Sequence, residues 1–95
     1  MSMAKKIETL LRQSLSISHL KVINESALHA GHAGDDGSGE SHFKLFIVSD
    51  DFLGLNRVAR HRKIYHILDD LMKKHIHALA IEALNPSEFQ PKDTF

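Results

Sequence analysis

Histidine is the residue type in this chain with the clearest capacity for chemistry. The sequence of 95 residues contains eight histidines and no cysteine. Imidazole is a good ligand for iron, zinc and copper, whereas most structural zinc sites and iron–sulfur clusters are built from thiolates. A chain without cysteine cannot form a disulfide scaffold, a zinc ribbon or a thiolate-ligated cluster from its own residues. Any such cluster would need thiolates from a partner.

Catalytic motifs do not stand out elsewhere in the sequence. There is no Ser/His/Asp order typical of hydrolases, no Walker loop and no paired-carboxylate motif. The two acidic pairs have simpler explanations, because Asp50-Asp51 fits a turn and Asp69-Asp70 fits the solvated face of a helix. We therefore expect that the protein is not an enzyme.

A basic segment of a predicted helix offers a different chemistry, which is contact with phosphate groups. Its members are Arg57, Arg60, Arg62 and Lys63. The alternative is a solvated helix face whose arginine stems pack over the sheet. The formal net charge of zero, from 12 basic and 12 acidic residues, argues against a protein that coats nucleic acid as histones do. Local contact with nucleic acid is therefore the second functional hypothesis.

The hydrophobic pattern predicts the elements that position these residues. Apolar side chains recur at helical spacing near the N-terminus, and His42–Ser49 alternates like a strand. Residues 25–41 hold four of the five glycines and are predicted to form a long flexible loop. The predicted elements are a helix at Met3–Leu15, strands at His19–Asn24, His42–Ser49 and Ile76–Leu84, a helix at Asn56–Lys74 capped by Asn56, and a tail at 90–95.

This order, α-β-β-α-β, brings particular histidines together. We predict an α/β fold with a three-stranded mixed sheet and the helices on one face. The first two strands should be antiparallel, and a right-handed crossover should make the second and third parallel. Parallel strands begin at the same end of a sheet, so His77 should lie beside the loop that carries His29 and His32. The basic part of the long helix should lie at the opposite end.

Length and composition predict one compact domain over residues 1–95, since 42% of the residues are hydrophobic. The expected core consists of Leu11, Val22, Phe43, Leu45, Ile64, Leu68, Leu79 and Ile81. The longest apolar run, Leu45–Val48, is much shorter than the roughly 20 residues of a membrane span. No secretory signal pattern fits the first helix. We therefore expect a cytoplasmic protein with no membrane partner.

The sequence resembles the BolA family from about Ile7 to Phe89. The resemblance is carried by five motifs in order: Asn24-Glu25-Ser26-Ala27-Leu28-His29, Glu40-Ser41-His42-Phe43-Lys44, Val48-Ser49-Asp50-Asp51-Phe52, Arg60-His61-Arg62-Lys63-Ile64-Tyr65 and Ile76-His77-Ala78-Leu79-Ala80-Ile81. Five ordered motifs at these separations are a highly specific match. The resemblance implies an α/β fold similar to the K-homology domain of the second topology, in agreement with the predicted element order.

The resemblance implies two functions. BolA-like proteins are partners of monothiol glutaredoxins, with which they share a 2Fe-2S cluster. In such a heterodimer the glutaredoxin and glutathione supply thiolates and the BolA-like protein supplies imidazole. Other family members bind DNA as regulators of cell morphology and stress responses. For this chain, the first function implies His77 as the strand-start ligand and His29 as the loop ligand.

Two histidines of the predicted loop, His29 and His32, are candidates for the second ligand. Some family members have a cysteine in this loop; this chain has none and resembles the all-histidine type. His29 lies five residues after Asn24 and precedes every glycine of the loop, whereas His32 follows the first. Ordering a chain costs on the order of 1 kcal/mol per residue, so we expect His29 as ligand and His32 as the alternative. The isolated chain is expected to carry no cluster and to be a monomer or a weak homodimer.

Overall fold

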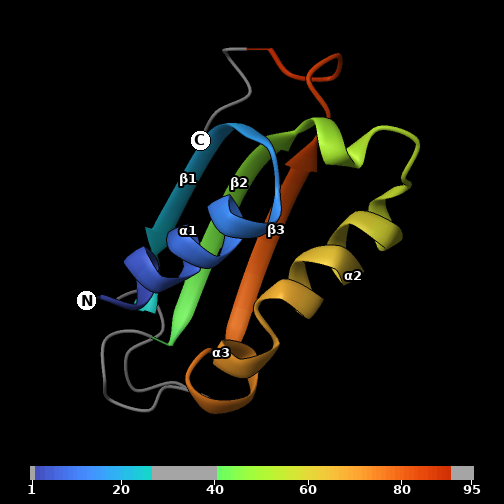
Figure 1. Cartoon of the computed structure of the whole chain (residues 1–95). Helices are drawn as coiled ribbons and strands as arrows, with labels where there is room; N and C mark the ends of the chain where they lie inside the picture. The colour runs from blue at the N-terminus through green and yellow to red at the C-terminus, as the bar shows by residue number, and fades with distance from the viewer. Residues whose placement is uncertain (1, 27–40, 91–95) are drawn as a thin grey trace.

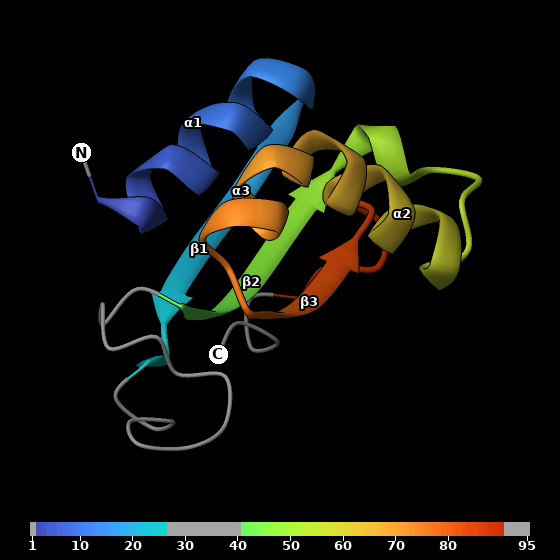
Figure 2. The same cartoon turned by 90° about the horizontal axis from the view of Figure 1, so that it is seen from below.

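The computed structural model describes residues 2–26 and 41–90. Its elements are α1 (Met3–Ser14), β1 (Ile17–Asn24), β2 (His42–Ser49), the short 3-10 helix η2 (Asp50–Phe52), α2 (Arg57–Ile67), α3 (Asp69–Lys74) and β3 (Ala78–Leu84). The strand order is β1-β2-β3, antiparallel between β1 and β2 and parallel between β2 and β3. The three α-helices lie on one face of the sheet (Figure 1 and Figure 2). The predicted fold class and topology are confirmed.

Helix α1 forms because its apolar residues recur at helical spacing and its first turn is capped. The Ser2 hydroxyl oxygen accepts a hydrogen bond from the Lys5 backbone N–H at 3.1 Å. Ile7 and Leu11 are fully buried in the core between helix and sheet. On the outer side, the Arg12 hydrogen bond and the Lys5 charge hold the pKa of the Glu8 carboxyl below its ordinary value. The sequence therefore fixes both the start of α1 and the face it buries.

Strand β2 is the centre of the sheet and is buried on both faces. Phe43, Leu45 and Ile47 belong to the core beneath the helices. Phe46 points to the other face, yet it is only 1% exposed. The Phe89 ring packs near it, with ring centroids 5.7 Å apart, and also lies 4.3 Å from the His19 ring of β1. The segment after β3 thus covers part of the sheet face that lies opposite the helices.

The predicted helix over Asn56–Lys74 is two helices, which corrects the sequence analysis. It starts as predicted, because the Asn56 side-chain oxygen accepts from the Ala59 N–H at 2.8 Å. It breaks at Leu68, whose backbone has φ −96° and ψ 12° and so leaves the regular helical range. Two acidic residues fill the first turn of α3, where the helix dipole favours negative charge, and Leu68 itself is fully buried. The break therefore coincides with an acidic first turn of α3 and with a buried residue, Leu68.

The predicted core is confirmed at six of its eight positions. Leu11, Phe43, Leu45, Ile64, Leu68 and Leu79 are buried. Val22 and Ile81 are partly buried and pack against this core, because each lies on one of the two outer strands of the sheet. Phe52 is fully buried without having been predicted. Its placement depends on η2, a single turn that hydrophobic periodicity does not reveal.

The turn after β3 is fastened to the domain by Glu88. One carboxylate oxygen accepts hydrogen bonds from Arg60 at 2.6 Å and from the Asn85 N–H at 2.9 Å. The Asn85 side-chain oxygen in turn accepts from the backbone N–H groups of Ser87 and Glu88. These bonds favour the charged carboxylate, so Arg60 first and Asn85 second lower the pKa of Glu88.

We expect acid to remove the contribution of Glu88 to stability. A carboxyl whose pKa is lower in the folded chain stabilises the fold above its unfolded pKa of about 4.3, and the effect is lost as the pH falls through the lowered value. Glu88→Gln should therefore lower the urea midpoint at neutral pH and have little effect in strongly acidic solution. Glu82→Gln, at an exposed position on β3, is the control. An equal loss from Glu88→Gln under both conditions would contradict this prediction.

Candidate functional site

His77 lies between α3 and β3, at the end of the sheet where β2 also begins. Its backbone N–H donates to the Ser41 carbonyl oxygen at 2.8 Å, which ties the residue to the start of β2. The His77 side chain is exposed. An exposed imidazole on a fixed backbone is accessible to a group that comes from outside the chain.

The two ends of the histidine-bearing loop meet at this point. Ser26 is 3% exposed, and its hydroxyl oxygen accepts from the N–H groups of Ser41 at 2.9 Å and His42 at 3.1 Å. The Glu25 N–H donates to the His42 carbonyl oxygen at 2.8 Å. One buried hydroxyl therefore holds the residues that enter and leave the loop together. The predicted placement of His77 beside the base of the loop is confirmed.

The candidate loop ligands His29 and His32 lie among residues 27–40, outside the described residues. The choice between them therefore stays a prediction. What the described residues establish is where the loop starts and ends relative to His77.

His42 lies next to His77, a proximity that the sequence analysis did not predict. The two ring centroids are 5.4 Å apart, and the ring planes are inclined by 49°. His42 is 5% exposed, and its Nδ1 lies 2.8 Å from the Ser41 hydroxyl oxygen. The signal was available, since His42 and His77 both stand where parallel neighbouring strands begin. The buried His42 ring therefore forms one side of the surroundings of the His77 ring.

The basic segment separates into exposed and buried members. Arg57, Arg62 and Lys63 are exposed on α2. Arg57 lines a shallow cavity with Ala83 and Leu84 at the far end of β3. Because a strand rises about 3.3 Å per residue, the seven residues of β3 put this end about 20 Å from His77. Arg57 is therefore separated from His77 as predicted.

Arg60 does not belong to the exposed surface, which corrects the predicted set of phosphate-contacting residues. It is 8% exposed. Its Nε donates to the Leu55 carbonyl oxygen at 2.8 Å, and one terminal nitrogen donates to the Ala83 carbonyl oxygen at 3.0 Å and to Glu88 at 2.6 Å. Arg60 therefore joins α2 to the end of β3 and to the turn that follows. For Arg60, the packed arginine stem is therefore the correct interpretation, and contact with phosphate is not.

Within residues 2–26 and 41–90, no three histidine, aspartate or glutamate side chains are grouped so that they could hold a metal ion. In the same part of the chain, no helix has the length and apolar character needed to cross a membrane. At this end of the sheet, His77 offers an exposed imidazole next to the buried ring of His42.

Comparison with known proteins extends these observations. The family model described as "BolA-like protein" matches residues 11–88. A Sinorhizobium protein described as uncharacterized, in the cobS 5' region, is 46% identical over 89 residues, which cover 93% of this chain and 96% of that protein. The Vibrio cholerae protein named DNA-binding transcriptional regulator BolA is 45% identical over 84 residues, which cover 88% of this chain and 76% of that protein.

A solved structure of a relative is also similar to this chain. BolA1 from Arabidopsis thaliana matches with a TM-score of 0.84 at 38% identity, over 95% of this chain and 98% of that chain. Some relatives are longer, since this chain spans 24% and 58% of the length of two Arabidopsis matches. The family model covers most of the sequence, and the topology is that of the solved relative. The chain therefore belongs to the BolA family.

Proposed function

We propose that this protein is the partner of a cytosolic monothiol glutaredoxin and shares with it a glutathione-assisted 2Fe-2S cluster in iron–sulfur trafficking or iron regulation. The observation that carries the proposal is the position of His77. Its imidazole is exposed, and its backbone is bonded to Ser41, which closes the histidine-bearing loop. Such a histidine can offer a ligand to a group that another protein delivers.

Imidazole ligands suit one of the two irons of a 2Fe-2S cluster. Two histidines replace two cysteines on one iron of Rieske centres, so imidazole is an established ligand for such an iron. In this chain His77 is one donor, and His29, or alternatively His32, is the second. The cluster, when bound, supplies the iron and sulfide that are passed on or sensed. The buried ring of His42 lies beside the His77 ring.

The residues that precede His77 also favour an anionic partner. Lys74 and His75 are exposed and immediately precede the site. The charge of the neighbouring Lys73 is balanced by an ion pair with Asp69 at 2.9 Å. Glutathione and thiolate-ligated clusters carry negative charge, so the positive charge of Lys74 favours their approach.

The test of this function uses cluster-loaded monothiol glutaredoxin. Mixing it with this protein should give a heterodimer of one copy of each and an altered visible circular-dichroism spectrum. His29→Ala should speed cluster loss more than His32→Ala, because His29 lies closer to the fixed base of the loop; the double variant should be fastest. If His32→Ala proves the more damaging single change, the ligand assignment is wrong. If all three variants match wild type, the loop supplies no ligand.

DNA binding in transcriptional regulation is the second candidate function. It is favoured by the name of the Vibrio cholerae relative and by the exposed basic side chains of Arg57, Arg62 and Lys63. Arg57 lies at the opposite end of β3 from His77, so the two functions can coexist in one molecule.

Direct phosphate contacts have a measurable signature. If Arg62 and Lys63 contact phosphates, replacing either with alanine should reduce the slope of log affinity against log salt by about one. Lys6→Ala, which removes an exposed charge from α1, is the matched control and should leave the slope unchanged. Absence of binding at about 50–100 mM salt, where phosphate contacts are strong, would eliminate this function.

A further inference from the structure

Two adjoining cavities lie between the first half of α2 and the second half of β3, on the side of the sheet where α2 runs beside β3 (Figure 1). Their volumes are about 320 and 350 Å³, and Arg57, Ala83 and Leu84 line both of them. Because the two cavities share these walls, they form one groove, which we call the α2–β3 groove. Its lining combines apolar residues of β3 with the basic residues Arg57 and His61 of α2.

The floor of the α2–β3 groove is apolar, and it does not offer a free strand edge. Ile81 and Ala83 are partly buried against the core. The Leu79 carbonyl oxygen accepts from the Tyr65 hydroxyl at 3.2 Å, and the Ala83 carbonyl oxygen accepts from Arg60 at 3.0 Å. Side chains of α2 thus occupy backbone acceptors that an added strand would need. An occupant of this groove is therefore held through side chains that enter it.

The α2 wall of the groove carries positive charge that the chain does not balance. Residues 52–68 contain no acidic residue, although the chain as a whole has a formal net charge of zero. In the part of the chain that the structure describes, Arg60 pairs with Glu88, whereas the Arg57 side chain forms no ion pair and the His61 ring forms no hydrogen bond. Both side chains are therefore available to an anionic ligand.

Two acidic residues lie close to the groove without neutralising Arg57. Ile81 packs against the core beneath the helices, so the next residue, Glu82, directs its carboxylate to the opposite face of the sheet. The Glu88 carboxylate is bonded to Arg60 at 2.6 Å. The charge of Arg57 therefore remains available for a carboxylate from outside the chain.

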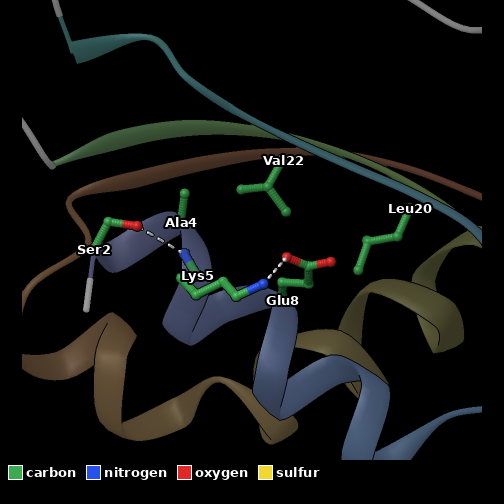
Figure 3. A pocket seen from close by; sticks show the side chains of 6 residues that line it. All are labelled: Ser2, Ala4, Lys5, Glu8, Leu20 and Val22. Carbon is green, nitrogen blue, oxygen red and sulfur yellow. Dashed lines mark hydrogen bonds and ion pairs between the residues drawn. The ribbon is translucent and has the colours of Figure 1, made fainter.

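A second groove, between α1 and β1, differs in size and in charge (Figure 3). Its volume is about 230 Å³. The Lys5 ammonium lies 3.4 Å from a carboxylate oxygen of Glu8, so the charges of its helical wall are paired with each other. The α2–β3 groove is the larger of the two and has the unbalanced cation, so it is the better site for an anionic ligand.

The acid-free stretch of chain also exposes large apolar side chains. Leu53, Val58 and Tyr65 are 59%, 57% and 39% exposed, and all three lie within residues 52–68. Tyrosine and arginine are enriched at protein–protein interfaces, where they contribute much of the binding energy. Single-stranded nucleic acids bind where their bases stack on aromatic rings, but Phe, Tyr and Trp are absent from the described residues that line the groove. A peptide is therefore favoured over a nucleic acid as the occupant.

We propose that the α2–β3 groove binds a short acidic segment of a partner protein, in which an apolar side chain stands between carboxylates. The apolar side chain packs on Ile81 and Ala83. One carboxylate accepts hydrogen bonds from the Arg57 guanidinium, and another accepts from the N–H of the His61 ring. The groove lies at the end of β3 opposite His77, so this segment does not compete for the cluster site.

The test titrates a short synthetic peptide, blocked at both ends, into the full-length, isotope-labelled protein. In this peptide one leucine stands between two pairs of glutamates. The amide signals of His61, Ile81 and Ala83 should shift with one common affinity. Arg57→Glu should weaken peptide binding at least about tenfold, because it places like charges across the interface. Lys6→Glu makes the same charge change on the exposed side of α1 and should have little effect.

Two altered peptides separate the contribution of charge from that of the apolar floor. Glutamines in place of the glutamates remove the ion pair with Arg57, and alanine in place of the leucine removes the side chain that packs on Ile81 and Ala83. Each altered peptide should bind at least about tenfold more weakly than the parent peptide. If the alanine peptide binds as tightly as the leucine peptide, only the exposed charges attract it and the groove is not its site.

Three further results would overturn the proposal. One is an absence of peptide binding, or binding that leaves the Ile81 and Ala83 signals unshifted or that Lys6→Glu weakens as much as Arg57→Glu. Another is an oligonucleotide of the same charge that shifts these signals at lower concentration than the peptide, which would assign the groove to nucleic acid. The last is a concentration-dependent shift of these signals without peptide, which would assign it to a second copy. None of these results depends on whether the protein binds a glutaredoxin.

Discussion

Arg60→Ala is expected to lower the free energy of unfolding by about 2–3 kcal/mol. The replacement removes the donor for two backbone carbonyls, those of Leu55 and Ala83, and the partner of Glu88. Breaking a buried ion pair can cost more than this. The Glu88 side chain is 43% exposed, however, so water replaces part of what it loses. Urea unfolding at neutral pH measures the difference.

The matched control is Arg62→Ala, which removes the same side chain from an exposed position two residues later. Its effect on stability should stay within about 0.5 kcal/mol. Arg60→Lys should recover only part of the loss, because one ammonium group cannot reproduce the fork of a guanidinium. If Arg60→Ala and Arg62→Ala are equally mild, the bonds of Arg60 do not stabilise the domain as described.

His77→Ala is expected to abolish stable sharing of the cluster while leaving the fold intact. Alanine keeps the backbone N–H that bonds to Ser41, and the lost imidazole is exposed, so stability should change by no more than about 0.5 kcal/mol. Loss of a direct ligand should weaken cluster retention by more than the roughly 10–100-fold typical of losing a supporting contact. Thermal unfolding of the variant and the iron content of its complex with glutaredoxin measure the two effects. His75→Ala is the control, because it removes an exposed histidine two residues earlier.

The strands and their order were predictable because β2 has a strong signal. The observed bounds of β2, His42–Ser49, are those predicted from its alternating apolar residues. With that strand placed, a helical crossover to a parallel strand determined which end of the sheet carries His77. The strand bounds and the position of His77 thus follow from the spacing of hydrophobic residues and from the order of the elements, and both can be read from a single sequence.

Features that depend on individual side-chain bonds were not predictable in the same way. A row of basic residues looks alike whether its arginines face water or carbonyls, so nothing in the sequence marked Arg60 as buried. Ser26 lies sixteen residues before its partner His42, and no local pattern connects them. The break at Leu68 was not predictable either, since the apolar spacing alone continues through it.

The visible circular-dichroism spectrum of cluster-loaded monothiol glutaredoxin, recorded during titration with wild type and with His77→Ala, tests the central claim most directly. Wild type should change the spectrum until one equivalent is added, because an imidazole replaces a ligand in the asymmetric environment of the iron. His77→Ala should leave the spectrum of the glutaredoxin unchanged, and His75→Ala should behave as wild type. A wild-type spectral change produced in full by His77→Ala would contradict the assignment of His77 as a cluster ligand.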